Sequence, residues 1–391
     1  MNSSLVVFLK EVRENMRDRR TVINTLFTGP LVAPLLFVLV INTMVTRELE
    51  KAENPLALPV AGSEYAPNLI AALKQDNVEI KSAPANPEKA VRDQDAEVVL
   101  RITPDFSEAW NKGEPAQVEL IYDRSQRDAN SSVQRLRAIL DNYSARTGAL
   151  RLLARGLSPS ILKPIVQADR DQSTPQSRSG IMFSMLPYFF ILGGFIGGMA
   201  LAIDTTAGER ERQSLEPLLA NPVPRWRILI GKLGATTAFS ITTVLLSIIA
   251  FSVVGKFLPT EKIGMTVTIG MRFTVYTIVA MLPLAALLAS MQTLVAAFAK
   301  SYREAQTYVS LLMFVPIVPT LLLSVMPFKP ETWMYSVPLM GQQVIITRLL
   351  RGDTVSGASL ALCFVCTAIA ALVACIVTAR IYQSERLAIS A

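Results

Sequence analysis

Two pairs of carboxylates and one pair of thiols are the side chains whose spacing could support catalysis. Paired carboxylates suit general acid–base hydrolysis, and a Cys-x-x-Cys pair suits thiol–disulfide exchange where an exposed helix N-terminus lowers a thiol pKa. The pairs are Asp93 with Asp95, Asp123 with Asp128, and Cys363 with Cys366. The aspartates lie in polar, charged stretches, and the cysteines lie in a long apolar stretch. We therefore interpret the aspartates as surface charge and the cysteines as small residues of an apolar core.

Composition excludes several other kinds of site. The 391 residues include no histidine, which excludes a His-based triad, a His-ligated zinc and a His-ligated haem. The sequence has no G-x-x-x-x-G-K-[ST] motif and therefore no P-loop of its own. Hydrophobic residues make up 51% and charged residues only 18%, whereas about a quarter of a soluble domain is charged. This composition excludes disorder and indicates a membrane protein.

Six charge-free apolar stretches are each long enough to cross a membrane as a helix, which takes roughly 17–25 residues. They are 21–46, 179–203, 233–255, 273–299, 305–328 and 354–379. A seventh stretch, 332–347, is shorter and contains Pro338 and Gly341, so we expect a re-entrant or surface segment there. We predict an α-helical polytopic membrane protein with six transmembrane helices.

The distribution of Lys and Arg predicts which side of the membrane each flank faces. Basic residues are concentrated in the N-terminal segment, the loop 204–232, the turn near Lys300 and the C-terminal tail. We therefore expect both termini in the cytoplasm and the segment 47–178 outside it. The net charge of +7 is then largely a topology signal read by anionic membrane lipid, and it gives no support for nucleic-acid binding.

The segment 47–178 is predicted to form an external α/β domain inserted between the first and second transmembrane helices. Period-two alternation and proline punctuation predict four strands. We expect them at 56–61, 77–82, 96–102 and 116–122, followed by a long helix near 127–155. A stretch rich in Ser, Pro and Gln links this domain back to the membrane. The remainder, 179–391, is predicted to supply the other five transmembrane helices.

The segment 1–20 is predicted to form an amphipathic helix in the cytoplasmic membrane interface, directly before the helix 21–46. Apolar residues recur at helical spacing, and charged residues fill the other face. An elbow helix of this kind would pack on the membrane domain and touch a cytoplasmic partner, while the alternative is an ordinary basic anchor. The residues assigned to the elbow are Phe8, Val12, Arg17, Asp18 and Arg19.

The loop 204–232 has the pattern of a docking segment. Alternating charges lead into three leucines, which a short cytoplasmic loop has little reason to expose unless something covers them. We interpret the leucines as docking into a groove of a partner, while the charges set the register through ion pairs. The alternative is that the leucines dip into the lipid interface. The residues assigned to this coupling segment are Glu209, Arg210, Glu211, Arg212, Leu215, Glu216, Leu218 and Leu219.

Small and polar residues within the apolar stretches indicate how the helices pack and what drives transport. Two overlapping G-x-x-x-G pairs permit close helix approach, within one subunit or between two, at Gly193, Gly194, Gly197 and Gly198. The candidate polar groups of a transport pathway are Asn24, Asn42 and Gln292. No Asp, Glu, Lys or Arg lies inside the six stretches, although carriers driven by ion gradients usually keep such charges at mid-membrane. We therefore expect the energy for transport to come from another subunit.

Three stretches resemble the membrane subunits of type-2 ABC exporters, in particular the NatB-like branch linked to sodium extrusion. They are the elbow 8–21 beginning FLKEVR, the coupling segment 209–232 beginning ERERQSLEPLL, and the turn 299–308 reading AKSYREAQTY. The order of one span, a large external domain and five further spans also resembles the family. The family often has a glycine just before its [ST]-L-E segment, where this chain has Gln213 and Ser214.

The resemblance implies a transport subunit of the bacterial cytoplasmic (inner) membrane. It implies two copies of a cytoplasmic P-loop ATPase as partners, with ATP-Mg bound on those subunits and no cofactor on this chain. It also implies a second permease copy, in a homodimer or in a heterodimer with a similar permease. ATP binding would close the ATPases, move the coupling segment and switch the helices between inward-facing and outward-facing states. Sodium is the implied substrate, while the same scaffold also serves drug, lipid and peptide exporters.

Two functions from other classes stay open at this point. A membrane-anchored sensor or scaffold would use the external α/β domain to bind a ligand or a protein. An intramembrane enzyme is the less favoured of the two, because the sequence has no histidine and no carboxylate pair within its apolar stretches. A P-loop ATPase encoded beside this chain would favour the exporter.

Overall fold

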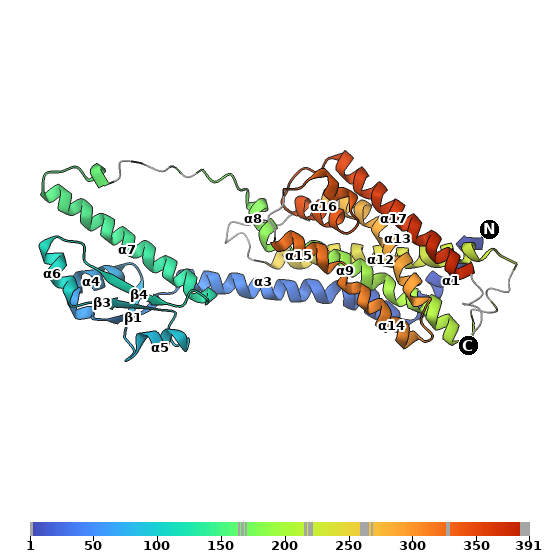
Figure 1. Ribbon diagram of the computed structural model, residues 1–391, viewed down its shortest axis with the longest axis horizontal. Coiled ribbons are helices and arrows are strands. Elements are labelled where there is room, and N and C mark those ends of the chain that lie inside the picture. Colours follow the sequence, from blue (N-terminus) through green and yellow to red (C-terminus); the bar gives the residue numbers. More distant parts are fainter. Residues whose placement is uncertain are drawn as a thin grey trace. The chain divides into compact units, whose positions relative to one another are not determined.

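The computed structural model describes residues 3–162, 165, 168, 170–214, 217, 222–258, 266, 269–325 and 329–383. The chain separates into two compact units, whose elements are labelled in Figure 1. One unit consists of Met1–Val45 together with Gln172–Ala391, and the other consists of Thr46–Asp171. Within the described ranges the first unit is helical, and the second contains the four strands of a single sheet.

Five helices of the described chain are long and apolar enough to cross a membrane. The spans are Thr25–Lys51, Leu186–Glu211, Arg225–Phe257, Met271–Ala296 and Gly357–Gln383. Their main helices are α3 (Gly29–Glu53), α9 (Leu186–Ile203), α12 (Arg225–Val254), α13 (Met271–Ala296) and α17 (Gly357–Gln383). Each overlaps one of the six apolar stretches, because an uninterrupted apolar run has to satisfy its backbone internally within a membrane. The chain is therefore a mostly helical, polytopic membrane protein.

The apolar stretch 305–328 differs from the expectation of one continuous helix. It contains α14 (Tyr302–Leu311) and α15 (Ile317–Val325), which a 3-10 turn at Leu312–Phe314 separates. Val315 keeps helical backbone, but Pro316 has no N–H to donate to the preceding turn and its ring crowds the carbonyl four residues earlier, so the α-helix is interrupted there. The sixth transmembrane helix therefore stays a prediction.

Helix α12 packs against several other helices of the first unit. Helix α9 packs along it, and α1 (Ser3–Arg17) packs along it as well. Helix α13 packs against α9, α12 and α17 (Figure 1). The short helix α2 (Arg19–Val22) and a π-helical turn at Ile23–Thr28 connect α1 to α3. Helix α8 (Pro175–Met182) precedes α9, and α16 (Met340–Leu350), in the segment expected to be re-entrant, is largely buried.

The second unit is built on a mixed four-stranded sheet of order β2-β1-β3-β4. Strand β1 (Leu56–Ala61) pairs in parallel with β2 (Val78–Ser82) and with β3 (Val98–Ile102), while β4 (Val118–Tyr122) is antiparallel to β3. Parallel neighbours require crossover connections, which α4 (Pro67–Gln75) and α5 (Pro87–Arg92) provide. Helices α6 (Asp105–Lys112) and α7 (Arg127–Ala154) complete the unit.

The main hydrophobic cluster of this unit lies on one face of the sheet. Leu58 of β1, Leu100 of β3 and Leu136 of α7 are fully buried there together. Strands β1 and β3 of this sheet pair over only part of their length. Strand β1 pairs with β2 along most of its length but with β3 only at Val60 and Ala61. Pro59, directly before this short register, has no N–H to donate to a neighbouring strand. The two strands therefore separate along the N-terminal half of β1.

Candidate functional site

A cluster of buried charged side chains lies near the end of α9 and the start of α12. The side chain of Lys232 is only 1% exposed, and its ammonium donates to the carbonyl oxygen of Thr205 at 2.6 Å. The same ammonium forms an ion pair with the carboxylate of Glu209, which is also buried. Removing charges from water is costly unless they are paired and hydrogen-bonded, and these contacts meet that condition. Glu11, Glu209 and Lys232, together with the half-exposed Lys10 beside them, are called the buried charge cluster below.

A π-helical turn over Asp204–Gly208 leads from α9 into α10 (Glu209–Glu211). A π-turn carries an extra residue and interrupts the regular ladder of backbone hydrogen bonds, a feature frequent at functional sites. The Thr205 carbonyl that accepts from Lys232 belongs to this turn. The turn therefore sets both the position of Glu209 and that of a second acceptor for Lys232.

Helix α1 contributes two further charges to the cluster. Lys10 Nζ lies 3.4 Å from Glu209 Oε1 and 3.2 Å from Glu11 Oε1. Glu11 is 2% exposed, and Asn15 donates to its main-chain oxygen at 3.0 Å. Burial raises the pKa of the Glu11 carboxyl, although the charges of Lys232 and Lys10 oppose this. Burial disfavours the charged form of Lys10, but the nearby carboxylates, Glu11 first, outweigh it and raise the pKa of Lys10 above its ordinary value.

The three charges that follow Glu209 contact other groups of their own chain. Arg210 donates to the Ala299 carbonyl at 3.4 Å, and Glu211 Oε2 accepts from the Tyr302 N–H at 2.7 Å. Arg212 forms an ion pair with Asp204 at 2.8 Å. The contacts of Arg210 and Glu211 join α10 to the turn before α14, and the pair of Arg212 with Asp204 closes the π-turn on itself. The other coupling residues, Leu215, Glu216, Leu218 and Leu219, lie outside the described residues.

The C-terminal end of α17 meets the same region. Tyr382 is 1% exposed, and its hydroxyl donates to Thr206 Oγ1 at 3.3 Å. Arg225, at the start of α12, donates to the carbonyl oxygen of Gln383 at 3.2 Å. Side chains from α1, the π-turn, α12 and α17 therefore converge on one short segment.

The sequence predicts Glu209 in the coupling segment and Glu11 on the charged face of the amphipathic helix, but Glu11 is buried instead. It assigns no role to Asn15 or Tyr382, and it counts Lys232 only among the cytoplasmic basic residues. Glu11 and Asn15 are four residues apart and lie on the buried face of α1 with Phe8 and Val12. A charged residue and an amide on the apolar face of an amphipathic helix need buried partners. That position was the available signal for these two, whereas only tertiary structure brings Lys232 and Tyr382 to them.

The five elbow residues divide into two groups. Phe8 and Val12 pack against buried residues of α9 and α12. Arg17, Asp18 and Arg19 lie where α1 ends and α2 begins, and all three are exposed. Phe8 and Val12 therefore hold α1 against other helices of the first unit, whereas Arg17, Asp18 and Arg19 lie at the surface.

The four glycines of α9 are buried along its contact with α12 and α13. A Cβ at Gly197 would lie 2.5 Å from Thr243 Oγ1, and one at Gly198 would lie 3.1 Å from Gln292 Oε1. The other two, Gly193 and Gly194, face Ser247 and Ser240 of α12. The missing side chains allow the helix backbones to approach this closely, and the approach lies within one chain.

Of the three candidate pathway residues, only Gln292 has a buried setting in the described chain. It is 1% exposed, and its amide N–H donates to the Phe195 carbonyl at 2.8 Å. Its Oε1 has no hydrogen-bond partner among the residues that the structure describes. Asn42 is exposed on α3, and the side chain of Asn24 lies outside the description. Gln292 therefore supplies one buried oxygen that is free to accept.

Two comparisons with known proteins bear on this geometry. Residues 19–379 match a protein-family model described as ABC-2 family transporter protein. The chain is also 26% identical over 352 residues to the ABC transporter permease protein NatB of Bacillus subtilis (strain 168). This alignment covers 88% of the chain and 89% of the relative. The family match includes the π-turn, α10 and α12, and with them Glu209 and Lys232.

Proposed function

The chain belongs to the ABC-2 family of transporter proteins and is a permease subunit whose ATPase is a separate chain; we propose that it exports its substrate by alternating access. Two copies of a cytoplasmic P-loop ATPase would bind ATP-Mg and dock on the segment 204–232. A second permease copy, identical or similar, would complete the complex. The proposed location is the bacterial cytoplasmic membrane, with both termini in the cytoplasm.

The observation that carries this proposal is the shared carboxylate of Glu209. It pairs with Lys232 of α12 and lies 3.4 Å from Lys10 of α1. Breaking the buried pair of Glu209 with Lys232 would cost about 3–5 kcal/mol, so a displaced coupling segment would carry α12 with it. The contact with the half-exposed Lys10 adds a weaker link to α1. This linkage supports a mechanism in which closure of the ATPases on bound ATP moves the membrane helices.

The docking segment is tested by the double substitution Leu215→Asp with Leu218→Asp. We would purify the chain with its partner ATPase and measure complex formation and ATP turnover. Since the leucines are proposed to fill a groove on the ATPase, we expect the substitution to abolish both. Leu150→Asp with Leu153→Asp is the matched control, because these two leucines have the same spacing and are 60% and 57% exposed in the unit Thr46–Asp171. A complex that survives the first substitution with coupled turnover would show that the segment does not dock.

We propose sodium as the exported substrate, with a drug, lipid or peptide as the alternative on the same scaffold. The support is the resemblance to the NatB-like branch, together with the unpartnered Gln292 Oε1. Small hard cations bind several oxygen ligands, and neutral oxygens replace the water shell of alkali ions in membrane proteins. Gln292 would supply one such ligand.

The substrate is tested by reconstituting the complex and following ATP-driven flux of radioactive sodium beside a panel of lipids, drugs and peptides. We expect Gln292→Leu to lower sodium flux strongly, while the same substitution at the exposed Gln134 of α7, Gln134→Leu, leaves it near the wild-type rate. Vigorous ATP hydrolysis without any sodium flux would remove sodium as the substrate and leave the permease assignment intact.

A further inference from the structure

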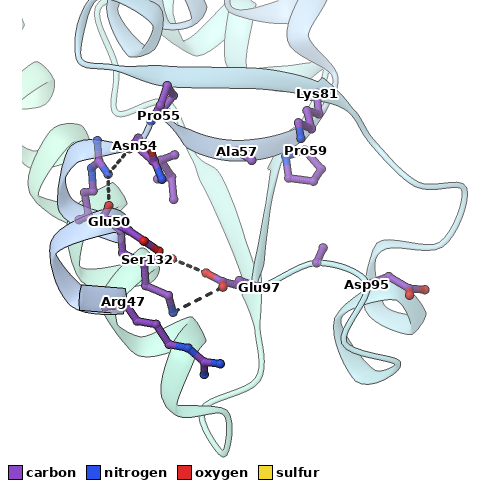
Figure 2. A pocket seen from close by; sticks show the side chains of 15 residues that line it. Arg47, Glu50, Asn54, Pro55, Ala57, Pro59, Lys81, Asp95, Glu97 and Ser132 are labelled. Carbon is purple, nitrogen blue, oxygen red and sulfur yellow. Dashed lines mark hydrogen bonds and ion pairs between the residues drawn. The ribbon is translucent and has the colours of Figure 1, made fainter. Parts of the chain in front are cut away.

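A pocket of about 620 Å³ lies within the unit Thr46–Asp171, over strand β1 (Figure 2). Its volume falls within the roughly 300–1,000 Å³ that is typical of small-molecule sites. Ala57 and Pro59 of β1 line its floor, and the end of α3, the start of α7 and the loop 95–97 form its walls. The buried charge cluster belongs to the other unit, so the pocket is a separate feature of the chain.

The floor of the pocket is an open strand edge. In a parallel ladder, the N–H and C=O of one residue point to the same side, and those of the next residue point to the opposite side. The Leu56 N–H donates to the Asn77 carbonyl on the β2 side at 3.0 Å, so the main-chain groups of Ala57 point towards β3. The β1–β3 register begins only at Val60. Ala57 therefore presents a main-chain donor and a main-chain acceptor to the pocket.

One wall of the pocket is held in place by its own hydrogen bonds. Lys51 pairs with Glu97 at 3.7 Å, and the Ser132 hydroxyl donates to the same carboxylate. Arg135 donates to the main-chain oxygens of Lys51 and Asn54 at 2.9 and 3.0 Å. These contacts join the end of α3, the start of α7 and the loop before β3, so the cavity is formed before any ligand arrives.

Charges of both signs remain available to a ligand. Two cations, Arg47 and Lys81, and two carboxylates, Glu50 and Asp95, line the pocket. Among the described residues, none of these four side chains has a hydrogen bond or an ion pair, and Figure 2 draws no interaction to Arg47, Lys81 or Asp95. Lys81 lies beside Pro59 in that view, while Arg47 and Asp95 lie on different sides of the pocket. The balance of free charge fits a zwitterion better than a simple anion or cation.

We propose that this pocket binds a short zwitterionic peptide. Its main chain pairs with the open edge at Ala57, as peptides that add a strand to a sheet do. Its carboxylate meets the free cations, and its ammonium meets the free carboxylates. Ala57 and Pro59 leave room on the floor for small side chains. This binding site goes beyond the proposed export function and does not depend on it.

The ligand class is tested with tri-alanine as the probe and the full-length chain in detergent, by isothermal titration calorimetry. We expect saturable binding that weakens roughly tenfold or more when either end of the peptide is blocked, because each blocked end loses a charged hydrogen bond. The blocked probes are N-acetyl-tri-alanine and tri-alanine amide. Equal binding of a blocked probe would show that the pocket does not recognise a zwitterion, and absence of saturable tri-alanine binding would overturn the proposal.

The location is tested with two pairs of variants. Ala57→Trp fills the pocket and is expected to abolish binding, whereas Ala71→Trp, at an exposed alanine of α4, is the matched control. Asp95→Asn is expected to weaken binding about tenfold, whereas Asp141→Asn, at an exposed position of α7, is not. Thermal unfolding of each variant shows that it is folded. Wild-type affinity in a folded Ala57→Trp chain would place the peptide elsewhere and refute the assignment.

Discussion

The ammonium of Lys232 and the carboxylate of Glu209 form an ion pair that is buried on both sides, with side chains 1% and 9% exposed. Lys232 begins the apolar run of α12, and Glu209 directly follows the π-turn after α9. Lys10 of α1 lies 3.4 Å from the same carboxylate. The pair therefore sits where α1, α10 and α12 meet, and its two buried charges depend on each other because little water reaches them.

Removing one partner of this pair should be far more damaging than removing both. Lys232→Met leaves the Glu209 carboxylate without its buried partner, which we expect to destabilise the chain by about 3–5 kcal/mol. Adding Glu209→Gln should restore most of that loss, because no unpaired buried charge remains. The free energy of unfolding in detergent is measured for the wild type, the two single variants and the double variant, which together form a double-mutant cycle. Lys300→Gln, at an exposed turn position, is the control, and additive effects of the two substitutions would contradict the pairing.

Glu11 should make stability depend on pH in a way that Glu11→Gln removes. Burial raises the pKa of the Glu11 carboxyl above its ordinary value of 4.5, so the folded state favours the protonated form. The stabilisation that the protonated Glu11 carboxyl gives the folded state is complete below pH 4.5. It is lost as the pH rises through the higher pKa that this carboxyl has in the folded state. We therefore expect the melting temperature of Glu11→Gln to exceed that of the wild type at mildly alkaline pH, and the difference to shrink towards pH 4.5.

The matched control for this titration is Glu14→Gln on the same helix. The Glu14 side chain is 62% exposed and forms an i,i+4 ion pair with Lys10, and exposed pairs contribute little to stability. Thermal unfolding across the pH range should follow the wild type for this variant. If the melting temperatures of Glu11→Gln and the wild type differ by the same amount at every pH, burial does not raise the pKa of the Glu11 carboxyl.

Gly197 should tolerate no side chain. A Cβ there would lie 2.5 Å from Thr243 Oγ1 and 3.1 Å from Ser240 Cα, so Gly197→Ala forces α9 and α12 apart. We expect a loss of about 1–3 kcal/mol in stability, as for other overpacked contacts. Gly255→Ala is the control, because a Cβ there has nothing within 4 Å. Equal melting temperatures of the two variants would contradict the close approach of these helices.

Glu211 should protect the first turn of α14. The N-terminal N–H groups of a helix lack intrahelical partners, and Glu211 Oε2 accepts from the Tyr302 N–H at 2.7 Å. Glu211→Ala should cost about 1 kcal/mol and accelerate hydrogen–deuterium exchange in the segment 299–311. Glu14→Ala, which removes an exposed carboxylate from α1, should leave exchange in that segment unchanged. Unaltered exchange in Glu211→Ala would show that the contact is not maintained in solution.

Hydropathy anticipates much of the helical part of this fold, because a long apolar run in a membrane has few alternatives to a helix. Helices α9, α12, α13 and α17 overlap the stretches selected on that basis. The stretch 305–328 was selected by the same criterion, yet its helix is interrupted. The length of a charge-free apolar stretch does not register Pro316, because its missing N–H acts at a single residue. In the second unit, the alternation at 96–102 predicts a strand, and β3 occupies Val98–Ile102.

The candidate site was less accessible from sequence. The alternating charges 209–212 suggest a solvent-facing segment, and Glu209 is nevertheless buried. Its partners are 23 and 199 residues away in the chain, and only the packing of α1 against α12 brings them together. The π-turn Asp204–Gly208 could not be predicted from the sequence either, because one extra residue in a helix is set by tertiary contacts rather than by local propensity.

The shared carboxylate also has a consequence for how the chain is made. Lys10 is synthesised 199 residues before Glu209, and Lys232 follows it 23 residues later. Because synthesis runs from the N-terminus, Glu209 leaves the ribosome after Lys10 and before Lys232. Lys10 can thus hold the carboxylate at the membrane surface until α12 inserts and delivers Lys232. A single side chain on the first helix would in this way act as an assembly guide for two helices in the middle of the protein.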